Sequence, residues 1–532
     1  MYDIMMINPP LCVNEYPLLG LPYMKAYLTS QGIENVKTID FNAEIMMSII
    51  YKGMKKVSDY YEEKGIDMPV SKVIDNFDKA RAALRDENVT KDKRQLSMIN
   101  TYLKIAGSNI FDIAFNPLDY ATVKKGLLEM DINASDNIII NYIREKVIPC
   151  FKNSSYIVAI SVPFSSQLFY ALLTAREIKR QYPGLYIVLG GSQITLFHNI
   201  LINDKEISQY FDGLIIGEGI QALKAIYNHV VNGAEKKDIS NFVYRDGDNV
   251  VQTDEPTEMI YSHLLTPDFS DINFKQYIYP KIPYKITDGC YWGKCVFCTY
   301  RKEGTCKSNN IDKVLSDIEM LKRKYGLFRF QFIDDAIEPR LLDELSQKIL
   351  ERGINIRYDA YLRLDKNFTE EKCCRYYESG LRSVLFGMET SNAEMLKIMN
   401  KGMLISDAVE VLKAMKKAKI SNVLSCITGF PTETAAMARE TTQFLLQHKD
   451  LYDVVFIMHF GMISDLIIKN QEKYQVEQLN LNDFRRYDDT GFVALEFPYK
   501  CKTGMSRDES YKILRESREA LGIINFGENL FS

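Results

Sequence analysis

Short apolar runs alternate with amphipathic stretches in two separate series along this 532-residue chain, and this alternation restricts the fold more than any other feature. In the first series, the stretch after most runs has the periodicity of an amphipathic helix. Each apolar run and the stretch that follows it therefore form a βα unit. Five such units predict a doubly wound parallel sheet of the Rossmann-like type. A long charged segment, about residues 49–153, separates the second and third strands, and we predict that it is a helical insertion. The five apolar runs are residues 3–8, 36–41, 156–162, 185–191 and 211–219.

The second series begins near residue 281 and contains six apolar runs. Six βα units predict a second parallel sheet, curved into a partial (β/α)6 barrel with its ligand groups at the carboxyl ends of the strands. We therefore expect an α/β protein with a first domain over 1–235, a linker with a hairpin over 236–280, a barrel over 281–460 and a C-terminal extension over 461–532. The runs of the second series are residues 284–287, 328–335, 355–363, 382–390, 421–430 and 453–460.

Charge and termini restrict the class of partner. The formal net charge is -4 and shows no basic footprint of the kind that nucleic-acid binding requires. The first residues, MYDIMMINPP, lack the features of a signal peptide, and no later run has the length and purity of a membrane span. We expect a cytoplasmic protein that binds neither nucleic acid nor membrane. In a reducing compartment, clustered cysteines indicate metal binding or catalysis more often than disulfides.

Three of the ten cysteines lie close together in the segment GCYWGKCVFCTY, residues 289–300. Cys290, Cys295 and Cys298 have the spacing C-x4-C-x2-C, and a loop with this spacing can wrap three thiolates around one metal centre. Zinc with Cys306 as fourth ligand, a plant-type two-iron centre, and an iron-sulfur cluster with one open iron are the three alternatives. The cysteines lie at the start of a series of six βα units, and not in a small β-rich domain or a zinc ribbon. This context favours the iron-sulfur cluster with one open iron.

On these residues the chain resembles the cobalamin-binding radical S-adenosylmethionine enzymes, over roughly residues 1–45 and 155–460. The usual loop of that family is C-x3-C-x2-C, so this loop has one residue more between its first two cysteines, whereas the aromatic Phe297 matches the family pattern. The resemblance implies a 4Fe-4S cluster on the three cysteines. It also implies that the open iron binds S-adenosylmethionine, which an electron from the cluster splits to give the 5'-deoxyadenosyl radical.

Polar residues at the strand ends after the cysteine loop are candidates for binding S-adenosylmethionine. A carboxylate would take its ammonium group, a guanidinium would pair with its carboxylate, and the other side chains would bind the ribose. A glycine would let the backbone approach the adenine. The alternative for each residue is a solvated strand end or a barrel salt bridge, but their shared position favours a site. The candidates for the ammonium group are Asp334 and Asp335, and the candidate for the carboxylate is Arg363. Those for the ribose are Glu389 and Ser391, and the glycine near the adenine is Gly429.

The first sheet resembles the cobalamin-binding module of the same family in the segments INPP, YPLLGLPYMKAYL, SVPFSSQ, LGGSQIT and GLIIGEG. Small residues at these turns suit a flat corrin ring that lies over the strand ends. None of the five histidines stands in an Asp-x-His-x-x-Gly motif, so we expect cobalamin without its own base and without a histidine ligand. We interpret His198, the nearest histidine, as a helix-surface residue. The expected cobalamin-binding residues are Ser161, Ser165, Gln167, Gly190, Gly191, Ser192, Gln193, Gly217, Glu218 and Gly219.

The resemblance implies an enzyme that transfers a methyl group to an unactivated carbon of a peptide or natural-product precursor. One S-adenosylmethionine would methylate the cobalt and a second would make the radical. Flavodoxin or ferredoxin is the expected electron donor. Two alternatives stay open: a cobalamin-dependent radical enzyme that rearranges or cyclises its substrate without methylation, and a corrinoid-binding sensor or electron carrier whose cluster is closed by Cys306.

Overall fold

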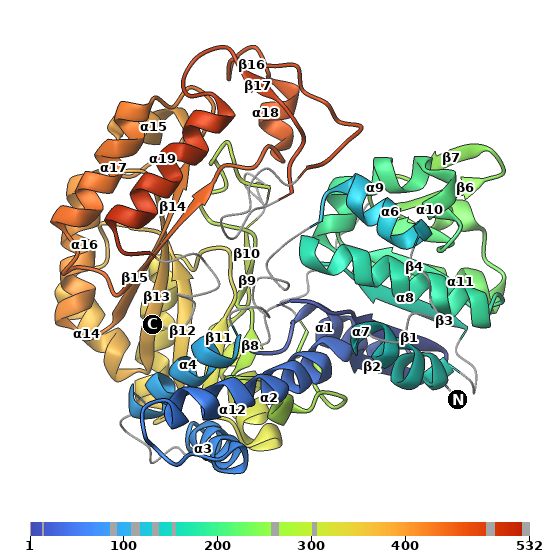
Figure 1. Ribbon diagram of the computed structural model, residues 1–532, viewed down its shortest axis with the longest axis horizontal. Helices are drawn as coiled ribbons and strands as arrows, with labels where there is room; N and C mark the ends of the chain where they lie inside the picture. The colour runs from blue at the N-terminus through green and yellow to red at the C-terminus, as the bar shows by residue number, and fades with distance from the viewer. Residues whose placement is uncertain are drawn as a thin grey trace. The chain divides into compact units, whose positions relative to one another are not determined.

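The computed structural model describes residues 2–12, 15–85, 93–107, 118–129, 138–151, 156–256, 265–299, 306–485 and 495–523 (Figure 1). The chain forms two compact units. Unit 1 consists of Met1–Lys79, Met98–Ile278 and Asn482–Tyr487, and unit 2 consists of Ala80–Ser97, Tyr279–Leu481 and Asp488–Ser532. Among the helices in the described ranges, none combines the length and apolar character needed to cross a membrane.

Unit 1 contains a seven-stranded sheet in the order β2-β1-β3-β4-β5-β6-β7. Strands β1 to β5 pair in parallel, and the hairpin of β6 and β7 continues the sheet antiparallel. The parallel core of this sheet confirms the predicted fold class. The strands are β1 (Ile4–Asn8), β2 (Val36–Asp40), β3 (Ile157–Ser161), β4 (Tyr186–Gly190), β5 (Gly213–Ile215), β6 (Phe242–Asp246) and β7 (Asn249–Gln252).

Helices follow the parallel strands of unit 1, and further helices occupy the chain between β2 and β3 (Figure 1). The strand-following helices are α1 (Gly20–Ser30), α8 (Leu168–Gln181), α9 (Ser192–Asn203), α10 (Lys205–Ser208) and α11 (Gly219–Asn232). Those between β2 and β3 are α2 (Phe41–Glu62), α3 (Val70–Ala83), α4 (Lys93–Gly107), α6 (Tyr120–Glu129) and α7 (Ile138–Tyr142).

Both faces of the central strands of unit 1 are buried. Ile4 and Met6 of β1 belong to a core cluster with Leu28 of α1 and Ile226 of α11. The alternate residues Met5 and Ile7 are buried as well, and therefore face the other side of the sheet. A strand that is buried on both faces needs a continuous apolar sequence, which explains why these strands appear as unbroken apolar runs.

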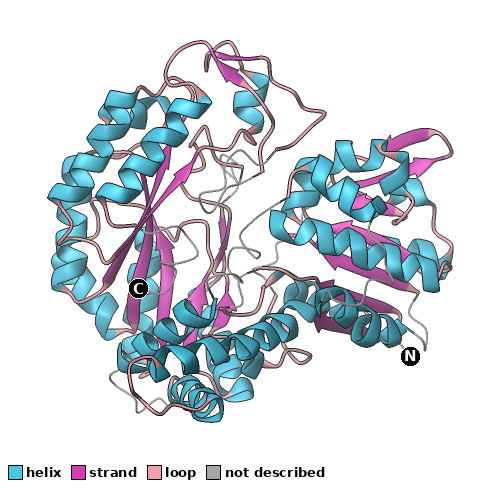
Figure 2. Ribbon diagram, viewed as in Figure 1, coloured by secondary structure: helices cyan, strands magenta, loops and turns pink. Residues whose placement is uncertain are grey.

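Unit 2 contains a six-stranded, wholly parallel sheet in the order β15-β14-β13-β12-β11-β8. Helices connect the strands and lie along the sheet (Figure 2). The strands are β8 (Ile282–Tyr284), β11 (Arg329–Phe332), β12 (Arg357–Leu362), β13 (Leu381–Glu389), β14 (Ser421–Thr428) and β15 (Val454–His459). The helices are α12 (Ile311–Tyr325), α13 (Pro339–Glu351), α14 (Glu370–Glu378), α15 (Ala393–Ile398), α16 (Ile405–Lys417) and α17 (Ala435–Gln447).

The first strand of this sheet ends at Tyr284, earlier than the predicted run of residues 284–287. The backbone amides of Ile286 and Thr287 instead donate to the carboxylate of Asp334, over 2.9 and 2.6 Å. These amides are therefore unavailable to the sheet. Thr287 and Asp288 form the short strand β9, which pairs antiparallel with β10 (Lys307–Ser308).

The C-terminal extension contributes to both units. Helix α19 (Arg507–Ala520) packs against α17, β14 and β15 of unit 2. Phe484 belongs to unit 1, where it is fully buried and stacks on Phe197 of α9 with 4.1 Å between ring centroids. The extension also contains α18 (Asp465–Lys469) and an antiparallel pair of β16 (Val476–Glu477) and β17 (Lys500–Cys501).

Candidate functional site

The cysteine loop follows β9, and its backbone is tied to the loop that follows α15. The amide of Val296 donates to the carbonyl of Met399 over 3.0 Å. The Trp292 indole donates to the Asn400 carbonyl over 2.8 Å, and the Asn400 side chain donates to the Lys294 carbonyl over 3.1 Å. These three bonds hold the loop that carries Cys290, Cys295 and Cys298 in a fixed path.

The three cysteines differ in exposure: Cys295 is buried, whereas Cys290 and Cys298 are partly exposed. Burial raises the pKa of the Cys295 thiol, and the positive charges of Lys401 and Arg363 act in the opposite direction. The described residues include no group of three or more His, Cys, Asp or Glu side chains arranged to hold a metal ion. The reason to place a cluster on this loop is therefore the chemical nature of its donor groups, which are three thiols.

Cys306, the alternative fourth ligand, lies beside the cysteine loop. The register of β9 and β10 pairs Lys307 with Asp288, and the Cys306 sulfur lies 3.5 Å from the Gly289 carbonyl. Burial, and then the negative charge of nearby groups led by Cys290, raise the pKa of Cys306 to about 11. This thiol lies outside the C-x4-C-x2-C loop, immediately before β10.

Arg363 follows β12 and lies against the cysteine loop. One of its guanidinium nitrogens is 3.8 Å from the Cys295 sulfur, and the other donates to the Lys401 carbonyl. The guanidinium also lies over the Trp292 ring, 4.7 Å from its centroid. Sequence reasoning placed Arg363 at a strand end but did not foresee these contacts.

Glu389, at the end of β13, forms a buried ion pair with Lys401 over 2.6 Å. The Lys401 ammonium lies 5.7 Å from the centroid of the Phe297 ring. Phe297 and Glu389, two of the predicted site residues, thus share one neighbour. Sequence analysis missed Lys401, because it lies in a loop without periodic pattern.

Asp334 is fully buried, and its Oδ1 atom accepts from Ile286, Thr287 and the Thr287 hydroxyl. Burial raises the pKa of this carboxyl to about 6 in spite of these bonds. Asp335 is partly exposed; burial raises the pKa of its carboxyl, while the positive charge of Lys285 acts against the rise. The two neighbouring carboxyls therefore have different surroundings, and Asp334 anchors the segment that leads into the cysteine loop.

Gly429 follows β14 and has a left-handed φ of 85°, which favours glycine. A Cβ atom at this position would lie 2.5 Å from His459 Nε2, so a side chain here would displace the histidine. The Gly429 amide donates to Glu433 Oε2 over 2.6 Å. Burial raises the pKa of Glu433 to about 7. Sequence analysis named Gly429 and missed Glu433, although a glutamate in the same short turn was a visible signal.

Four buried oxygen atoms near the carboxyl ends of three strands of this sheet have no hydrogen-bond partner among the described residues. They are Asp334 Oδ2 after β11, Ser391 Oγ after β13, and Thr432 Oγ1 and Glu433 Oε1 after β14. Buried polar atoms are nearly always paired in folded proteins, so an unpaired group calls for a ligand, an ion or a water molecule. These atoms fit a polar ligand at the strand ends.

In unit 1, the predicted cobalamin-binding loops lie at the carboxyl ends of three adjacent parallel strands. Ser161 pairs with Gly190 in the register of β3 and β4. Ser192 donates to the Pro163 carbonyl over 2.6 Å, and the Gln193 amide donates to the Val162 carbonyl over 3.2 Å. The loops after β3 and β4 are thus bonded to one another and present small residues, as a flat ligand requires.

The loop after β5 is bonded to the first turn of α9, which follows β4. The Gly217 amide donates to the Thr195 hydroxyl over 2.9 Å, and both Gly217 and Glu218 are exposed. Gly191 immediately precedes α9, and Gly219 is the first residue of α11.

Ser165 and Gln167 lie in a short 3-10 turn after β3 and differ in exposure. Ser165 is partly exposed, whereas Gln167 is fully buried. The Gln167 amide nitrogen donates to Asn8 Oδ1 over 2.8 Å and to the Pro9 carbonyl over 2.6 Å. Gln167 thus ties the loop after β3 to the loop after β1.

His198 lies on α9, and its Nδ1 atom is 2.8 Å from the carbonyl of Thr195 in the same helix. This geometry agrees with the interpretation of His198 as a helix residue.

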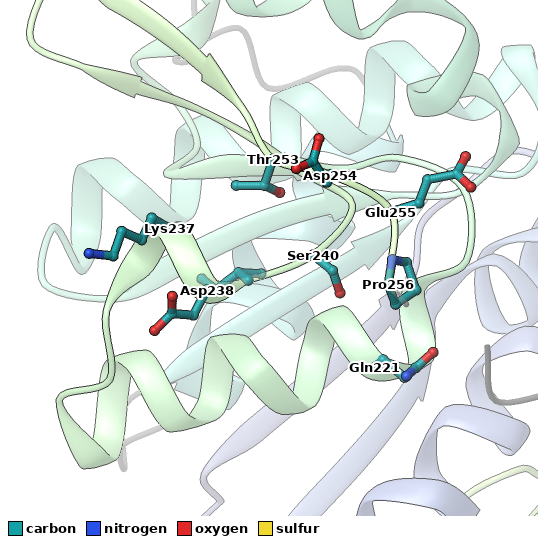
Figure 3. Close-up of a pocket in the computed structure, with 9 residues that line it drawn as sticks. Gln221, Lys237, Asp238, Ser240, Thr253, Asp254, Glu255 and Pro256 are labelled. Carbon is teal, nitrogen blue, oxygen red and sulfur yellow. The ribbon is translucent and has the colours of Figure 1, made fainter. Parts of the chain in front are cut away.

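An open polar hollow of about 520 Å³ lies in unit 1 beside α11 and the end of β7 (Figure 3). Its lining includes Gln221, Lys237, Asp238, Asp254 and Glu255. None of the residues predicted to bind cobalamin lines it. We do not include it in the candidate site.

Comparisons with known proteins agree with this architecture. A family model described as the Radical SAM superfamily matches residues 284–445. An uncharacterised methyltransferase of Pyrococcus horikoshii is 23% identical over 290 residues, which are 53% of this chain and 62% of that protein. The anaerobic magnesium-protoporphyrin IX monomethyl ester cyclase of Cereibacter sphaeroides is 23% identical over 299 residues, 53% of this chain and 48% of that protein. The chain thus spans less than two thirds of either relative.

A solved structure extends the similarity to both units. The radical S-adenosylmethionine methyltransferase TsrM from Kitasatospora setae, with cobalamin and a 4Fe-4S cluster bound, aligns with a TM-score of 0.55 and 13% sequence identity over 90% of this chain and 81% of its own. Residues 284–445 are therefore similar to a radical SAM domain. The chain has the fold of this solved structure over both units.

Proposed function

We propose that this chain is a cobalamin-dependent radical S-adenosylmethionine enzyme that methylates an unactivated carbon of a peptide or natural-product precursor. The observation that carries the proposal is the position of unpaired buried oxygens, among them those of Asp334, Ser391 and Glu433, near the carboxyl ends of strands in the sheet of unit 2. Ligands of parallel α/β folds bind at this end of the strands. The methyltransferase relatives support the reaction class.

In this proposal the chain's own residues bind and orient the cofactors. Cys290, Cys295 and Cys298 hold the 4Fe-4S cluster, and the strand-end residues hold S-adenosylmethionine. The free Asp334 and Glu433 oxygens suit its ammonium group, and Ser391 suits a ribose hydroxyl. When bound, the cluster supplies the electron that cleaves S-adenosylmethionine, and cobalamin carries the methyl group.

Cobalamin is assigned to the strand ends of unit 1. The loops 161–167, 190–193 and 217–219 support this assignment, because they follow adjacent strands and lack bulky apolar side chains apart from the exposed Phe164. A reductant of the flavodoxin or ferredoxin class completes the proposal, and we place the reaction in the cytoplasm.

A second candidate is a radical enzyme that cyclises or rearranges its substrate without methylation. The similarity to the cyclase of Cereibacter sphaeroides favours it, since that relative covers as much of this chain as the methyltransferase does.

The amounts of the two products of S-adenosylmethionine distinguish these candidates. The test uses anaerobically reconstituted protein with cobalamin and reductant, and short peptides encoded beside its gene as candidate substrates. A methyltransferase should release S-adenosylhomocysteine and 5'-deoxyadenosine in roughly equal amounts, as measured by mass spectrometry. Deoxyadenosine without S-adenosylhomocysteine supports the cyclising enzyme. The matched Cys295→Ala protein should release no deoxyadenosine, and the proposal is wrong if it releases as much as the wild type.

A further inference from the structure

Three charged side chains lie buried beside the cysteine loop. Arg363, Lys401 and Glu389 are 8, 5 and 6% exposed. Charged groups are rarely buried unless they are paired, because removing them from water is costly. Their joint burial at this loop therefore calls for a specific reason.

Lys401 and Glu389 form a pair that is electrically almost neutral, with 2.6 Å between the ammonium and the carboxylate. Arg363 is different. Among the residues that the structure describes, no carboxylate forms an ion pair with Arg363. Its positive charge is thus the uncompensated charge of this group of three, and it lies 3.8 Å from the Cys295 sulfur.

The guanidinium of Arg363 is held in place from two further sides. One nitrogen donates to the Lys401 carbonyl, and the plane lies over the Trp292 ring at 4.7 Å. Trp292 is itself bonded to the Asn400 carbonyl. Gly402 leaves room for this ring, because a Cβ atom there would lie 2.0 Å from it. The guanidinium therefore cannot leave Cys295 without a rearrangement of the surrounding loops.

We propose that Arg363 is a positioning residue of the cluster, which donates a hydrogen bond to the Cys295 thiolate and raises the reduction potential of the cluster. This inference rests on the proposed function, because it requires a cluster on the three cysteines. Reduction adds a negative charge to a cluster. A fixed cation and a hydrogen bond to a ligating sulfur stabilise the reduced form more than the oxidised form.

The test is a redox titration of the reconstituted protein, followed by electron paramagnetic resonance. Arg363→Gln removes the charge, and Arg363→Lys keeps it without the planar fork. The Gln variant should show at least a tenfold lower ratio of reduced to oxidised cluster at a fixed potential, which corresponds to about 59 mV for one electron. The Lys variant should lie between Gln and wild type. Arg375→Gln is the matched control; it removes an arginine on α14 that pairs with Asp343 over 2.8 Å, and it should leave the potential unchanged.

The iron and sulfide contents of each protein show whether it binds a cluster. They therefore distinguish a failure of the inference from a failure of the proposed function. If the wild type binds a cluster and the Gln variant binds it with an unchanged potential, the inference is wrong and the proposed function stands. If the wild type binds no cluster at all, both are wrong. If the Gln variant loses its cluster, the Lys variant decides: a potential equal to that of the wild type overturns the inference, and a lower one supports it.

Discussion

The Nε2 atom of His459, the last residue of β15, lies 2.6 Å from the hydroxyl oxygen of Ser510 on α19. The other ring nitrogen, Nδ1, lies 2.7 Å from the Phe460 carbonyl, which can only accept. Nδ1 therefore carries a proton. The Ser510 hydroxyl also lies 2.7 Å from the Arg507 carbonyl, so its one hydrogen has two acceptors within reach, this carbonyl and His459 Nε2. The ring stacks on Tyr511 at 4.0 Å, so His459 links the C-terminal helix to the edge strand of the barrel.

This histidine predicts a stability that depends on pH. Burial, and then the charges of Arg507 and Arg518, lower the pKa of His459 well below its ordinary value of 6.5. The unfolded chain takes up a proton below about pH 6.5 while the folded chain does not, so stability is lost as the pH falls below that value. Thermal unfolding between about pH 5 and pH 8 should show this loss in the wild type.

Variants assign the effect to His459. His459→Gln should weaken the dependence on pH below 6.5, the ordinary histidine value. Ser510→Ala should retain the dependence but cost about 1 kcal/mol at neutral pH, the usual value of one hydrogen bond. His229→Gln, which changes a partly exposed histidine of α11, is the control and should behave as the wild type. An unchanged pH dependence in His459→Gln would contradict the assignment.

Glu433 should have the opposite dependence. Burial raises the pKa of its carboxyl from 4.5 to about 7, so the folded chain keeps a proton that the unfolded chain releases. Stability is then lost as the pH rises from about 4.5 to 7. The glutamine of the Glu433→Gln variant stays neutral at every pH. Near pH 8 this variant should therefore unfold at a higher temperature than the wild type, with a free energy of unfolding that is larger by about 1–3 kcal/mol. The advantage should vanish at acidic pH. Glu516→Gln, on the exposed side of α19, should show no such crossover.

The fold was predictable from the sequence because strands that are buried on both faces leave continuous apolar runs, and helices of steady amphipathic spacing separate them. This pattern predicted where β11, β12 and β13 end, and therefore that Asp334, Arg363 and Glu389 lie at or near those ends. The directions in which these side chains point could not be predicted from the pattern. The contact of Arg363 with Cys295 depends on Trp292 and on the loop after α15, which no periodicity describes.

The C-terminal extension shows a second limit. Helix α19 has an interpretable start, since Ser506 is its N-cap and accepts from the Glu509 amide. Its docking on β15 was not predictable, because it depends on contacts between residues far apart in the chain, such as His459 with Ser510 and the Ile457 carbonyl with Arg518. The burial of Phe484 in unit 1 likewise has no local signal.

Iron content tests the cysteine ligands. Cys290→Ala, Cys295→Ala and Cys298→Ala should each lose most of the reconstituted iron. Cys306→Ala should retain it, because Cys306 lies outside the C-x4-C-x2-C loop, immediately before β10. Cys374→Ala, an exposed cysteine of α14, is the matched control. If Cys306→Ala loses its iron as fully as the other three, the cluster is closed and the protein is better interpreted as an electron carrier.

The last prediction concerns the lower face of cobalt. None of the five histidines lies in the motif that places imidazole on cobalt. Cob(II)alamin bound to the protein should therefore have no nitrogen ligand, either from the chain or from its own base. Its electron paramagnetic resonance spectrum should lack nitrogen superhyperfine splitting, and His198→Ala should leave it unchanged. Splitting that disappears in His198→Ala would identify His198 as a ligand, whereas splitting that persists would point to the base of the cofactor; either result contradicts the prediction.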